Sequence, residues 1–409
     1  MKILVVHNPY QQLGGEDIVF QQECRVLRRG GHEVITYCRT NDEIKSMSAL
    51  QKITLAPRAI WASDSKRQLA DLLARLKPDL VHVHNTFIMI SPAAFSACYE
   101  AGIPVVHTLH NYRLMCPAGT FYRQGKVCEE CTHDGLLAGI RHACYHDSSA
   151  LTAVVASMIA VHRRLDTWTH PLHYYIALSQ FARNKFIESG MPKDRIFVKP
   201  NFVDPDPGPC DEKENYVVFV GRLSPEKRVS TLLNAWEGCS SKFPLKILGG
   251  GPQLSELQEV AREKKLDGVH FMGHMPRNQA VATIRKARFL IFSSEWYENF
   301  PVTIVEAFAS ATPVIASRLG AMQEIVTDGR TGLHFEPGNA QDLAQKMDWA
   351  WTHPEEMRVR GHAARAEYEA KYAWEKNYAQ LMNIYHRVLA GDQAPTSEMV
   401  EPELVTQTG

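Results

Sequence analysis

The sequence lacks an excess of charge of either sign. Lys and Arg together number 45, and Asp and Glu together also number 45, so the formal net charge at pH 7 is zero. A protein that binds nucleic acid through its phosphates usually carries a basic excess. We therefore expect no nucleic-acid partner, and we expect any anion-binding site to be local.

Long hydrophobic runs are also missing. No segment approaches the roughly 20 apolar residues that a membrane-spanning helix needs, and the longest apolar stretch, residues 150–161, includes Thr152 and Ser157. The first apolar segment, residues 3–6, is too short for the hydrophobic region of a signal peptide. These absences predict a cytoplasmic protein.

Two further absences narrow the function. No Gly-x-Gly-x-x-Gly motif follows the first expected strand, which disfavours a dehydrogenase. The cysteine count is nine, and an odd number in a chain of this length argues against a framework of disulfides.

What the chain does contain is a repeated alternation of strands and helices. Apolar residues make up 45% and charged residues 22% of 409 residues, which suits a globular protein of two domains. Strands separated by helices predict parallel sheets. We expect them at residues 3–6, 33–37, 78–83, 103–109, 174–178, 196–198, 216–220, 245–248, 269–273, 289–292 and 313–316.

The predicted fold class is α/β, with two Rossmann-like, doubly wound domains facing each other across a cleft. A Pro-, Gly- and charge-rich linker near residue 204 separates them. In such sheets, ligands bind at the carboxyl ends of the strands. The expected parts are an N-terminal domain (1–203) with a Cys-rich insert (about 112–165), a C-terminal domain (204–372), a helix packing back on the first domain (373–390), and a disordered tail (391–409).

The strongest candidate site is a pair of carboxylates. Glu298 and Glu306 are separated by seven residues, and Pro301 lies at the expected start of the helix that carries Glu306. Both glutamates can then face one cleft, where free N–H groups of the first helical turn bind anions or hydroxyls. The alternative is an acidic loop followed by a solvent-exposed helical glutamate; for the pair, we favour a functional site.

At these residues the sequence resembles the retaining glycosyltransferases of family 4, which have the GT-B fold. Residues 298–306 (ENFPVTIVE) match the family's Glu-x7-Glu motif, and residues 221–227 (GRLSPEK), 249–252 (GGGP) and 328–333 (DGRTGL) match three other family segments. The resemblance covers essentially residues 1–390. Two departures, Ala311 and Asn299, occupy positions where the family usually has Gly, and they leave the identity of the donor sugar open.

The resemblance implies that residues 1–203 form the acceptor-side domain and residues 204–372 the donor domain. It also implies roles for individual residues. Arg222 and Lys227 would bind the donor diphosphate, Glu306 the ribose hydroxyls, and Glu298 the region of the anomeric carbon. Fixed cations stabilise the charge that builds on a leaving diphosphate. The catalytic set is expected to be Glu298, His110, Arg222 and Lys227. The donor-binding set is expected to be Gly14, Gly15, Arg222, Lys227, Gly249, Met275, Asn299, Phe300, Pro301, Val302 and Glu306.

The predicted activity is transfer of a hexose from a nucleoside diphosphate sugar, with retention of configuration, to a glycan or lipid-linked acceptor. The expected setting is the synthesis of surface polysaccharides or glycoconjugates. The resemblance also implies that no catalytic metal is needed. The leaving phosphate oxygen is proposed to take the acceptor proton in this family, so no dedicated enzymic base is expected either. Two alternatives remain: a sugar-nucleotide epimerase of the same fold, and a non-catalytic protein that binds nucleotide sugars.

Four cysteines form a separate pattern. Cys116, Cys128, Cys131 and Cys144 have the spacing C-x11-C-x2-C-x12-C. A Cys-x-x-Cys pair is a common half of a tetrahedral zinc site, and the two flanking cysteines would complete it. We expect a structural zinc that fastens a loop with no regular hydrophobic pattern. Reduced thiols without metal, or a redox pair, are the alternatives.

The next segment, residues 136–164, is apolar with interspersed basic residues. Such a segment can contact a membrane surface or a lipid-linked acceptor, which would place the protein at the inner face of the membrane. The alternative, which we slightly favour, is a helix packed into the core.

Overall fold

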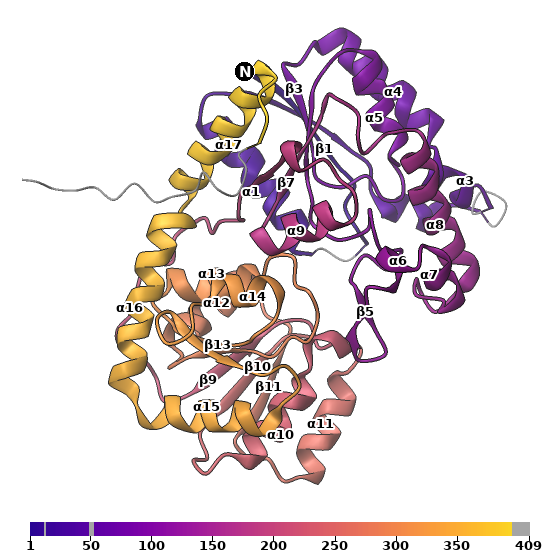
Figure 1. The fold of residues 1–409 in the computed structure, drawn as a ribbon. Helices are drawn as coiled ribbons and strands as arrows, with labels where there is room; N and C mark the ends of the chain where they lie inside the picture. The colour runs from indigo at the N-terminus through magenta and orange to yellow at the C-terminus, as the bar shows by residue number, and fades with distance from the viewer. Residues whose placement is uncertain (12–13, 49–52, 395–409) are drawn as a thin grey trace, which may run out of the picture.

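The computed structural model describes residues 1–11, 14–48 and 53–394. Two α/β lobes lie one above the other, and the C-terminal helices run along one side of both (Figure 1). The first lobe holds a six-stranded sheet in which all neighbouring strands are parallel. Its strands, in order across the sheet, are β2 (Glu33–Cys38), β1 (Lys2–His7), β3 (Leu80–Val83), β4 (Val105–Thr108), β7 (His173–Ala177) and β8 (Ile196–Val198).

The second lobe repeats this architecture with another parallel six-stranded sheet. Its strands, in order across the sheet, are β11 (Val269–Gly273), β10 (Leu245–Leu248), β9 (Val217–Val220), β12 (Leu290–Phe292), β13 (Val314–Ser317) and β14 (Gly332–Phe335). The expected α/β class with two doubly wound domains is therefore confirmed, and the expected strands lie within a few residues of the observed ones.

The central strands are apolar because both faces of each sheet are covered by helices. In β1, for example, Ile3 and Val5 belong to one hydrophobic cluster, and Leu4 and Val6 to the cluster on the opposite face. The helices of the first lobe are α1 (Gly15–Arg29), α3 (Leu55–Ile60), α4 (Ser63–Leu76), α5 (Ala93–Glu100), α8 (Ser149–Arg164) and α9 (Gln180–Glu188).

Helices cover both faces of the second sheet as well. They are α10 (Val229–Gly238), α11 (Leu254–Glu263), α12 (Arg277–Lys286), α13 (Val302–Ala309), α14 (Gly320–Ile325), α15 (Ala340–Thr352) and α16 (Pro354–Lys371). The last helix, α17 (Trp374–Ala390), returns to the first lobe, where Leu381, Ile384 and Tyr385 join Ile3 and Val5 in one cluster. The C-terminal segment therefore ties the two lobes together.

Two glycines allow the loops after β9 and β10 to pack backbone against backbone. A Cβ on Gly249 would lie 1.9 Å from the carbonyl oxygen of Gly221, and a Cβ on Gly251 would lie 2.3 Å from that of Leu223. No side chain fits at either position. This contact lies at the carboxyl ends of the strands and places Arg222 there.

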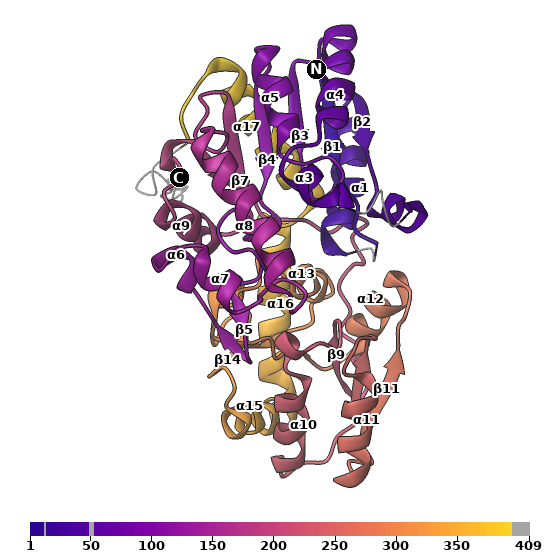
Figure 2. The same cartoon turned by 90° about the vertical axis from the view of Figure 1, so that its right-hand side faces the viewer.

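The Cys-rich insert extends from the first lobe toward the second. It contains a short hairpin of β5 (Tyr122–Arg123) and β6 (Lys126–Val127), followed by α6 (Glu130–His133) and α7 (Leu137–Arg141). Figure 2 shows β5 reaching down beside the second lobe.

Polar contacts also join the lobes. Glu324 of α14 accepts hydrogen bonds of 2.8 Å from the backbone N–H groups of Gln180 and Phe181, at the start of α9. This carboxylate satisfies two of the free donors that every helix start leaves.

None of the helices in the described ranges has the length and hydropathy needed to cross a membrane. Of the predicted C-terminal tail, residues 395–409 lie outside the described part of the chain.

Candidate active site

A cavity of about 920 Å³ lies between the two lobes. The first lobe contributes His110 and Leu178, which follow β4 and β7, and the second contributes Arg222, which follows β9, and Glu298, which precedes α13. These positions are at the carboxyl ends of parallel strands, where ligands bind in this class of fold. The cavity is large enough for a ligand of nucleotide-sugar size.

Glu298 is a charged residue of the cavity wall. Its Oε1 forms an ion pair with the Lys227 ammonium and accepts a hydrogen bond of 2.7 Å from Ser294 Oγ. The side chain of Glu298 is 8% exposed and that of Lys227 is 17% exposed. Because both are largely withdrawn from water, their attraction is weakly screened. The loop of β9 and the loop before α13 are thereby held together.

Arg222 is the cation with no such partner. Its side chain is exposed and lines the cavity, and its guanidinium has no hydrogen bond or ion pair with any residue that the structure describes. A guanidinium offers a planar set of donors that matches phosphate oxygens. Arg222 is therefore free to bind an anion in the cleft.

Glu306 lies on α13, outside the cavity lining, and pairs with Arg277 of α12. Its Oε1 is 2.7 Å from Arg277 Nε, and the residue is buried. Burial raises the pKa of the Glu306 carboxyl, although the Arg277 guanidinium acts in the opposite direction. Of the two glutamates expected to face the cleft, only Glu298 lines the cavity itself, because the helical turn directs Glu306 against α12.

Asn299 connects the two lobes at the site. Its Nδ2 donates a hydrogen bond to the carbonyl of Leu109, the residue before His110. Its Oδ1, and the Oδ1 of buried Asn201, have no partner among the described residues, and both side chains line the cavity. A buried amide oxygen without a partner is costly, so both are well suited to accept hydrogen bonds from a ligand.

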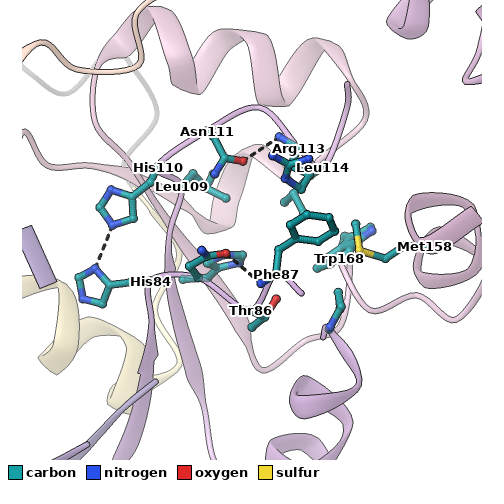
Figure 3. A pocket seen from close by; sticks show the side chains of 13 residues that line it. His84, Thr86, Phe87, Leu109, His110, Asn111, Arg113, Leu114, Met158 and Trp168 are labelled. Carbon is teal, nitrogen blue, oxygen red and sulfur yellow. Dashed lines mark hydrogen bonds between the residues drawn. The ribbon is translucent and has the colours of Figure 1, made fainter. Parts of the chain in front are cut away.

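His110 is the end of a buried chain of polar groups. Its Nε2 lies 2.9 Å from His84 Nδ1, a contact shown at the left of Figure 3. His84 Nε2 lies 3.2 Å from Glu23 Oε2, and Glu23 Oε1 lies 2.7 Å from Lys199 Nζ. Burial alone would raise the pKa of Glu23, but the Lys199 ammonium and the hydrogen bond from His84 hold it well below its usual range.

This chain fixes which nitrogen of His110 is available. In the tautomer in which His84 donates from Nε2 to Glu23, its Nδ1 accepts a hydrogen bond from the Nε2–H of His110. Burial, with His84 nearby, holds the pKa of His110 well below its usual value. His110 is therefore neutral and keeps Nδ1 free to accept a hydrogen bond.

Three side chains of this cluster are spaced like the ligands of a metal ion, but each already has another partner. Glu23, His82 and His84 offer ligand atoms within 4.8 Å of one another. However, the Lys199 ammonium already occupies the carboxylate, and His82 uses Nδ1 for a 2.6 Å hydrogen bond with the Tyr385 hydroxyl and Nε2 for one with a threonine. A cation does not fit beside this ammonium.

The loop at the start of α1 also lines the cavity through Gly14 and Gly15. The Gly14 N–H donates a 2.7 Å hydrogen bond to Asp17 Oδ2, so it is not available to a phosphate. Burial, with Asp17 nearby, raises the pKa of Glu16 to about 8. Acidic residues in the first turn make this helix start better suited to hydroxyl groups than to a diphosphate.

The other expected donor-binding residues support the wall around Glu298. Phe300 and Val302 line the cavity, and Pro301 lies directly before α13. Met275 packs with Phe300 and Val302 against the core of the second lobe. Gly249 acts through the backbone contact that positions the Arg222 loop.

Several site residues are not evident in the sequence. Glu23 is a partial exception, since it lies between Val19 and Leu27 on the buried face of α1, where a carboxylate is unusual. Ser294 and Arg277 carry no comparable signal, because only the tertiary fold brings them to Glu298 and Glu306.

Comparisons with known proteins agree with this geometry. The model of "Glycosyltransferase Family 4" matches residues 13–207, and that of "Glycosyl transferases group 1" matches residues 203–367. A glycogen synthase of Mycobacterium tuberculosis is 24% identical, with 97% of each chain covered. An uncharacterized glycosyltransferase of Methanocaldococcus jannaschii is 28% identical over 52% of this chain, which spans only 59% of that relative.

Solved structures share the fold. Anabaena Alr3699/HepE in complex with UDP has a TM-score of 0.68 at 18% identity, with 94% of this chain and 99% of that chain covered. A sucrose-phosphate synthase of Thermosynechococcus elongatus has a TM-score of 0.69 at 18% identity, covering 96% and 100%. The two family models together span residues 13–367. The chain thus belongs to the family 4 glycosyltransferases, with the two-domain GT-B fold.

Proposed function

We propose that this protein transfers a hexose from a nucleoside diphosphate sugar to a hydroxyl of a glycan or lipid-linked acceptor, with retention of the anomeric configuration. One observation carries the proposal: Arg222, which has no partner among the described residues, and Glu298, which is paired with Lys227, line the same cavity as His110. The wall of the second lobe is suited to phosphate, and the wall of the first lobe to hydroxyl groups.

The donor diphosphate binds to Arg222 and Lys227 in this proposal. When the bond between the anomeric carbon and the phosphate oxygen breaks, negative charge builds on the leaving diphosphate. Fixed cations in a largely dry cleft stabilise that charge more strongly than water does. The diphosphate competes with Glu298 for Lys227, which leaves the carboxylate of Glu298 beside the developing positive charge on the sugar.

The hexose lies between the lobes and meets acceptors of hydrogen bonds. His110 Nδ1, Asn299 Oδ1 and Asn201 Oδ1 each lack a partner within the described ranges and accept bonds from sugar hydroxyls. The acceptor oxygen forms the new bond to the anomeric carbon on the face that the phosphate leaves, and its proton passes to the leaving phosphate oxygen. Because Arg222 and Lys227 supply the compensating charge, we propose that the reaction uses no catalytic metal.

Glu306 binds the ribose of the nucleotide. A buried carboxylate accepts two hydrogen bonds from a diol at once, and Arg277 holds it in place from α12. Binding of the hydroxyls would offset the cost of burial that raises the pKa of this carboxyl.

The acceptor is proposed to approach from the membrane surface, in the synthesis of a surface polysaccharide or glycoconjugate. Curated relatives named for O-antigen chain and phosphatidyl-myo-inositol mannosyl transfer support this setting. One face of α8 packs into the core. A core-packed helix was the alternative expected for residues 136–164. Three leucines of this segment are exposed: Leu137 of α7 (74%), Leu151 of α8 (48%) and Leu165, directly after α8 (55%). Exposed basic residues also lie on α7 and α8.

Membrane contact is tested by flotation with vesicles that contain anionic lipid. We expect the wild-type protein to float and the variant Leu137→Ser/Leu151→Ser to remain in solution. The matched control is Leu389→Ser, which changes an exposed leucine of α17 on the far side of the first lobe. Equal flotation of all three proteins, or of none, would contradict this role.

Donor use is tested with a panel of UDP-, GDP-, TDP- and CMP-sugars. We expect the release of a nucleoside diphosphate from one donor, increased by an oligosaccharide or lipid-linked acceptor. An epimerase would convert the donor sugar without an acceptor. A non-catalytic binding protein would bind nucleotide without turnover under every condition.

A further inference from the structure

The proposed reaction gives no role to the four cysteines of the Cys-rich insert, yet the structure of this insert requires an explanation. Its hairpin strands have two residues each, α6 has four and α7 has five. Elements of this length are not stable without tertiary contacts.

Its backbone is also unusually strained. Phe121, Gln124, Ala143, His146 and Asp147 all adopt positive φ, between 49° and 52°. Such conformations persist only where the surroundings fix them. A segment with so little regular structure needs a strong local constraint.

Four thiols converge within this insert. Cys116 lies in the loop after β4, Cys128 follows β6, Cys131 lies in α6, and Cys144 follows α7. None forms a disulfide, and Cys116 and Cys131 are buried. Gly139 of α7 connects three of these positions: a Cβ there would lie 3.1 Å from Cys131 Sγ and 3.2 Å from the side chain of Pro117, which follows Cys116, and the Gly139 carbonyl accepts a 3.1 Å hydrogen bond from the Cys144 N–H.

Cys128 is held beside the loop that carries Cys116. The Cys128 N–H donates a 2.8 Å hydrogen bond to the carbonyl of Phe121, the Cys116 N–H donates a 2.9 Å hydrogen bond to the carbonyl of Tyr112, and the Tyr112 and Phe121 rings pack with centroids 5.0 Å apart. The four cysteines therefore lie in one part of the insert, although no three of their sulfurs lie mutually within 4.8 Å in the described part of the chain. A bound ion would bring the four thiols closer together.

Charged side chains of both signs surround the thiols. The Arg123 guanidinium lies near the Cys128 thiol but is paired with Glu130, and Arg163 lies near the Cys131 thiol. Four thiolates around one divalent cation carry a net charge of −2, which Arg163 would partly offset.

We propose that Cys116, Cys128, Cys131 and Cys144 bind one structural Zn²⁺ ion in tetrahedral coordination, and that this ion holds the insert as a brace between the two walls of the cleft. On binding, the four thiols release four protons and form four zinc–sulfur bonds, with no change of oxidation state. The set has four protein ligands and no open position, which is the composition of a structural rather than a catalytic zinc site.

The hairpin braces the donor side. The carbonyl of Gly125, in the hairpin turn, accepts a hydrogen bond from Arg228 Nη2, and Arg228 Nε lies 2.8 Å from Glu295 Oε2. Arg228 follows Lys227 directly, and Glu295 lies three residues before Glu298. The hairpin therefore fixes the two loops that carry the central ion pair.

Two further contacts strengthen this brace. The Tyr297 hydroxyl donates a 2.8 Å hydrogen bond to Glu129 Oε1, and Lys185 Nζ lies 2.9 Å from Glu129 Oε2. Glu129 lies between Cys128 and Cys131, so the contact originates within the Cys-x-x-Cys pair itself.

The other end of the insert forms part of the acceptor side. Cys144 is followed by Tyr145 and His146, and both line the cavity. The strained backbone of Ala143, His146 and Asp147 flanks this position. A metal ion held by Cys144 would fix the wall of the cleft on that side as well.

The first test is metal content, which does not depend on any turnover. We expect the purified full-length chain to contain one zinc per molecule by plasma mass spectrometry, and the variant Cys128→Ser/Cys131→Ser to contain none. Cys210→Ser is the matched control, since Cys210 is a partly exposed thiol near the linker, and it should retain one zinc. A wild-type chain without zinc, even after incubation with the metal, would overturn the proposal, as would bound iron with inorganic sulfide.

A second measurement keeps the proposal falsifiable if the double variant does not fold. Zinc is removed from the wild-type chain with a chelator and replaced by Co²⁺, which should give the visible absorption of tetrahedral cobalt thiolate, with one equivalent needed for saturation. Absence of this spectrum would contradict four-thiolate ligation.

The brace is tested by hydrogen exchange. On removal of zinc, exchange should become faster in residues 113–147 and in the donor loops at 224–228 and 294–299, and zinc should restore protection. Unchanged exchange in the donor loops would overturn the bracing role. Because neither readout requires a sugar donor, failure of the zinc site and failure of the proposed transferase function are distinguishable.

Discussion

Some charged residues at the cleft have an oppositely charged partner, and others have none. Lys227 and Glu298 neutralise each other, whereas Arg222 has no partner among the described residues. The free guanidinium is the most direct structural reason to expect an anionic ligand. Its removal should therefore affect donor use without affecting the fold.

We expect Arg222→Ala to lower kcat/KM for the nucleotide sugar by about 100- to 1,000-fold, because one fixed donor to the leaving diphosphate is lost. Arg222→Lys should recover only part of the rate, since an ammonium cannot bind two phosphate oxygens in a planar fork. Steady-state kinetics with circular dichroism measures both effects. Arg262→Ala, an exposed arginine of α11, is the control; equal rates for Arg222→Ala and this control would refute the assignment.

The buried Lys199–Glu23 pair makes a separate prediction about stability. Glu23→Gln leaves the Lys199 ammonium buried without its counter-charge, which should cost about 3–5 kcal/mol of the free energy of unfolding. Glu23→Gln/Lys199→Met removes both charges and should recover most of that loss. Urea unfolding is the measurement, and Glu214→Gln, which breaks an exposed ion pair with Lys286, should change stability little. A double variant no more stable than the single one would contradict the charge argument.

At the level of secondary-structure elements, the site depends on how closely two loops approach. The loops after β9 and β10 meet through backbone atoms, so the position of Arg222 is set by glycine rather than by side-chain packing. The insert acts in a comparable way on the loops that carry Lys227 and Glu298.

Two adjacent glycines allow a matched test of this packing. Gly249→Ala would place a Cβ 1.9 Å from the Gly221 carbonyl oxygen, whereas at Gly250 the nearest atom is His274 Cβ at 3.9 Å. We expect Gly249→Ala to weaken donor binding and lower the midpoint of thermal unfolding, and Gly250→Ala to resemble wild type. Calorimetric titration with nucleotide and a thermal scan measure both. Similar effects of the two substitutions would show that the loop contact does not position the site.

At the level of the whole molecule, buried histidines link stability to pH. Burial lowers the pKa of His7, His82, His107, His110 and His173 below the ordinary value of 6.5. The unfolded chain therefore binds more protons than the folded chain at mildly acidic pH, and folding loses stability as pH falls below about 6.5.

We expect the free energy of unfolding to decrease between pH 7 and pH 5. Below pH 6.5 the slope reaches at most about 1.4 kcal/mol per pH unit for each histidine whose folded-state pKa lies well below the pH. Glu16 and Glu306, whose pKa values burial raises, act in the opposite direction above their unfolded pKa but are fewer. Urea unfolding at several pH values measures the slope. A stability that rises on acidification through this range would contradict the assignment of these histidines as buried and neutral.

Much of this architecture follows from the sequence because parallel sheets bury apolar strands on both faces. The continuous apolar runs of β1 and β9 are therefore visible, and the return to the same pattern after residue 204 indicates the second domain. The contacts that the site residues make with other side chains are harder to predict from the sequence. Nothing in the spacing of Glu298 and Glu306 indicates that the first pairs with Lys227 and the second with Arg277. Those pairings depend on loop paths and helix rotation, which only the folded chain defines.

The central claim is that the cleft transfers a sugar with retention, and the anomeric configuration of the product tests it most directly. The donor identified in the panel is incubated with its acceptor, and the new linkage is examined by proton NMR. We expect acceptor-dependent formation of a glycoside with the same anomeric configuration as the donor, and loss of that product with Arg222→Ala. An inverted linkage, or tight nucleotide binding with no glycoside formed from any donor, would contradict the account.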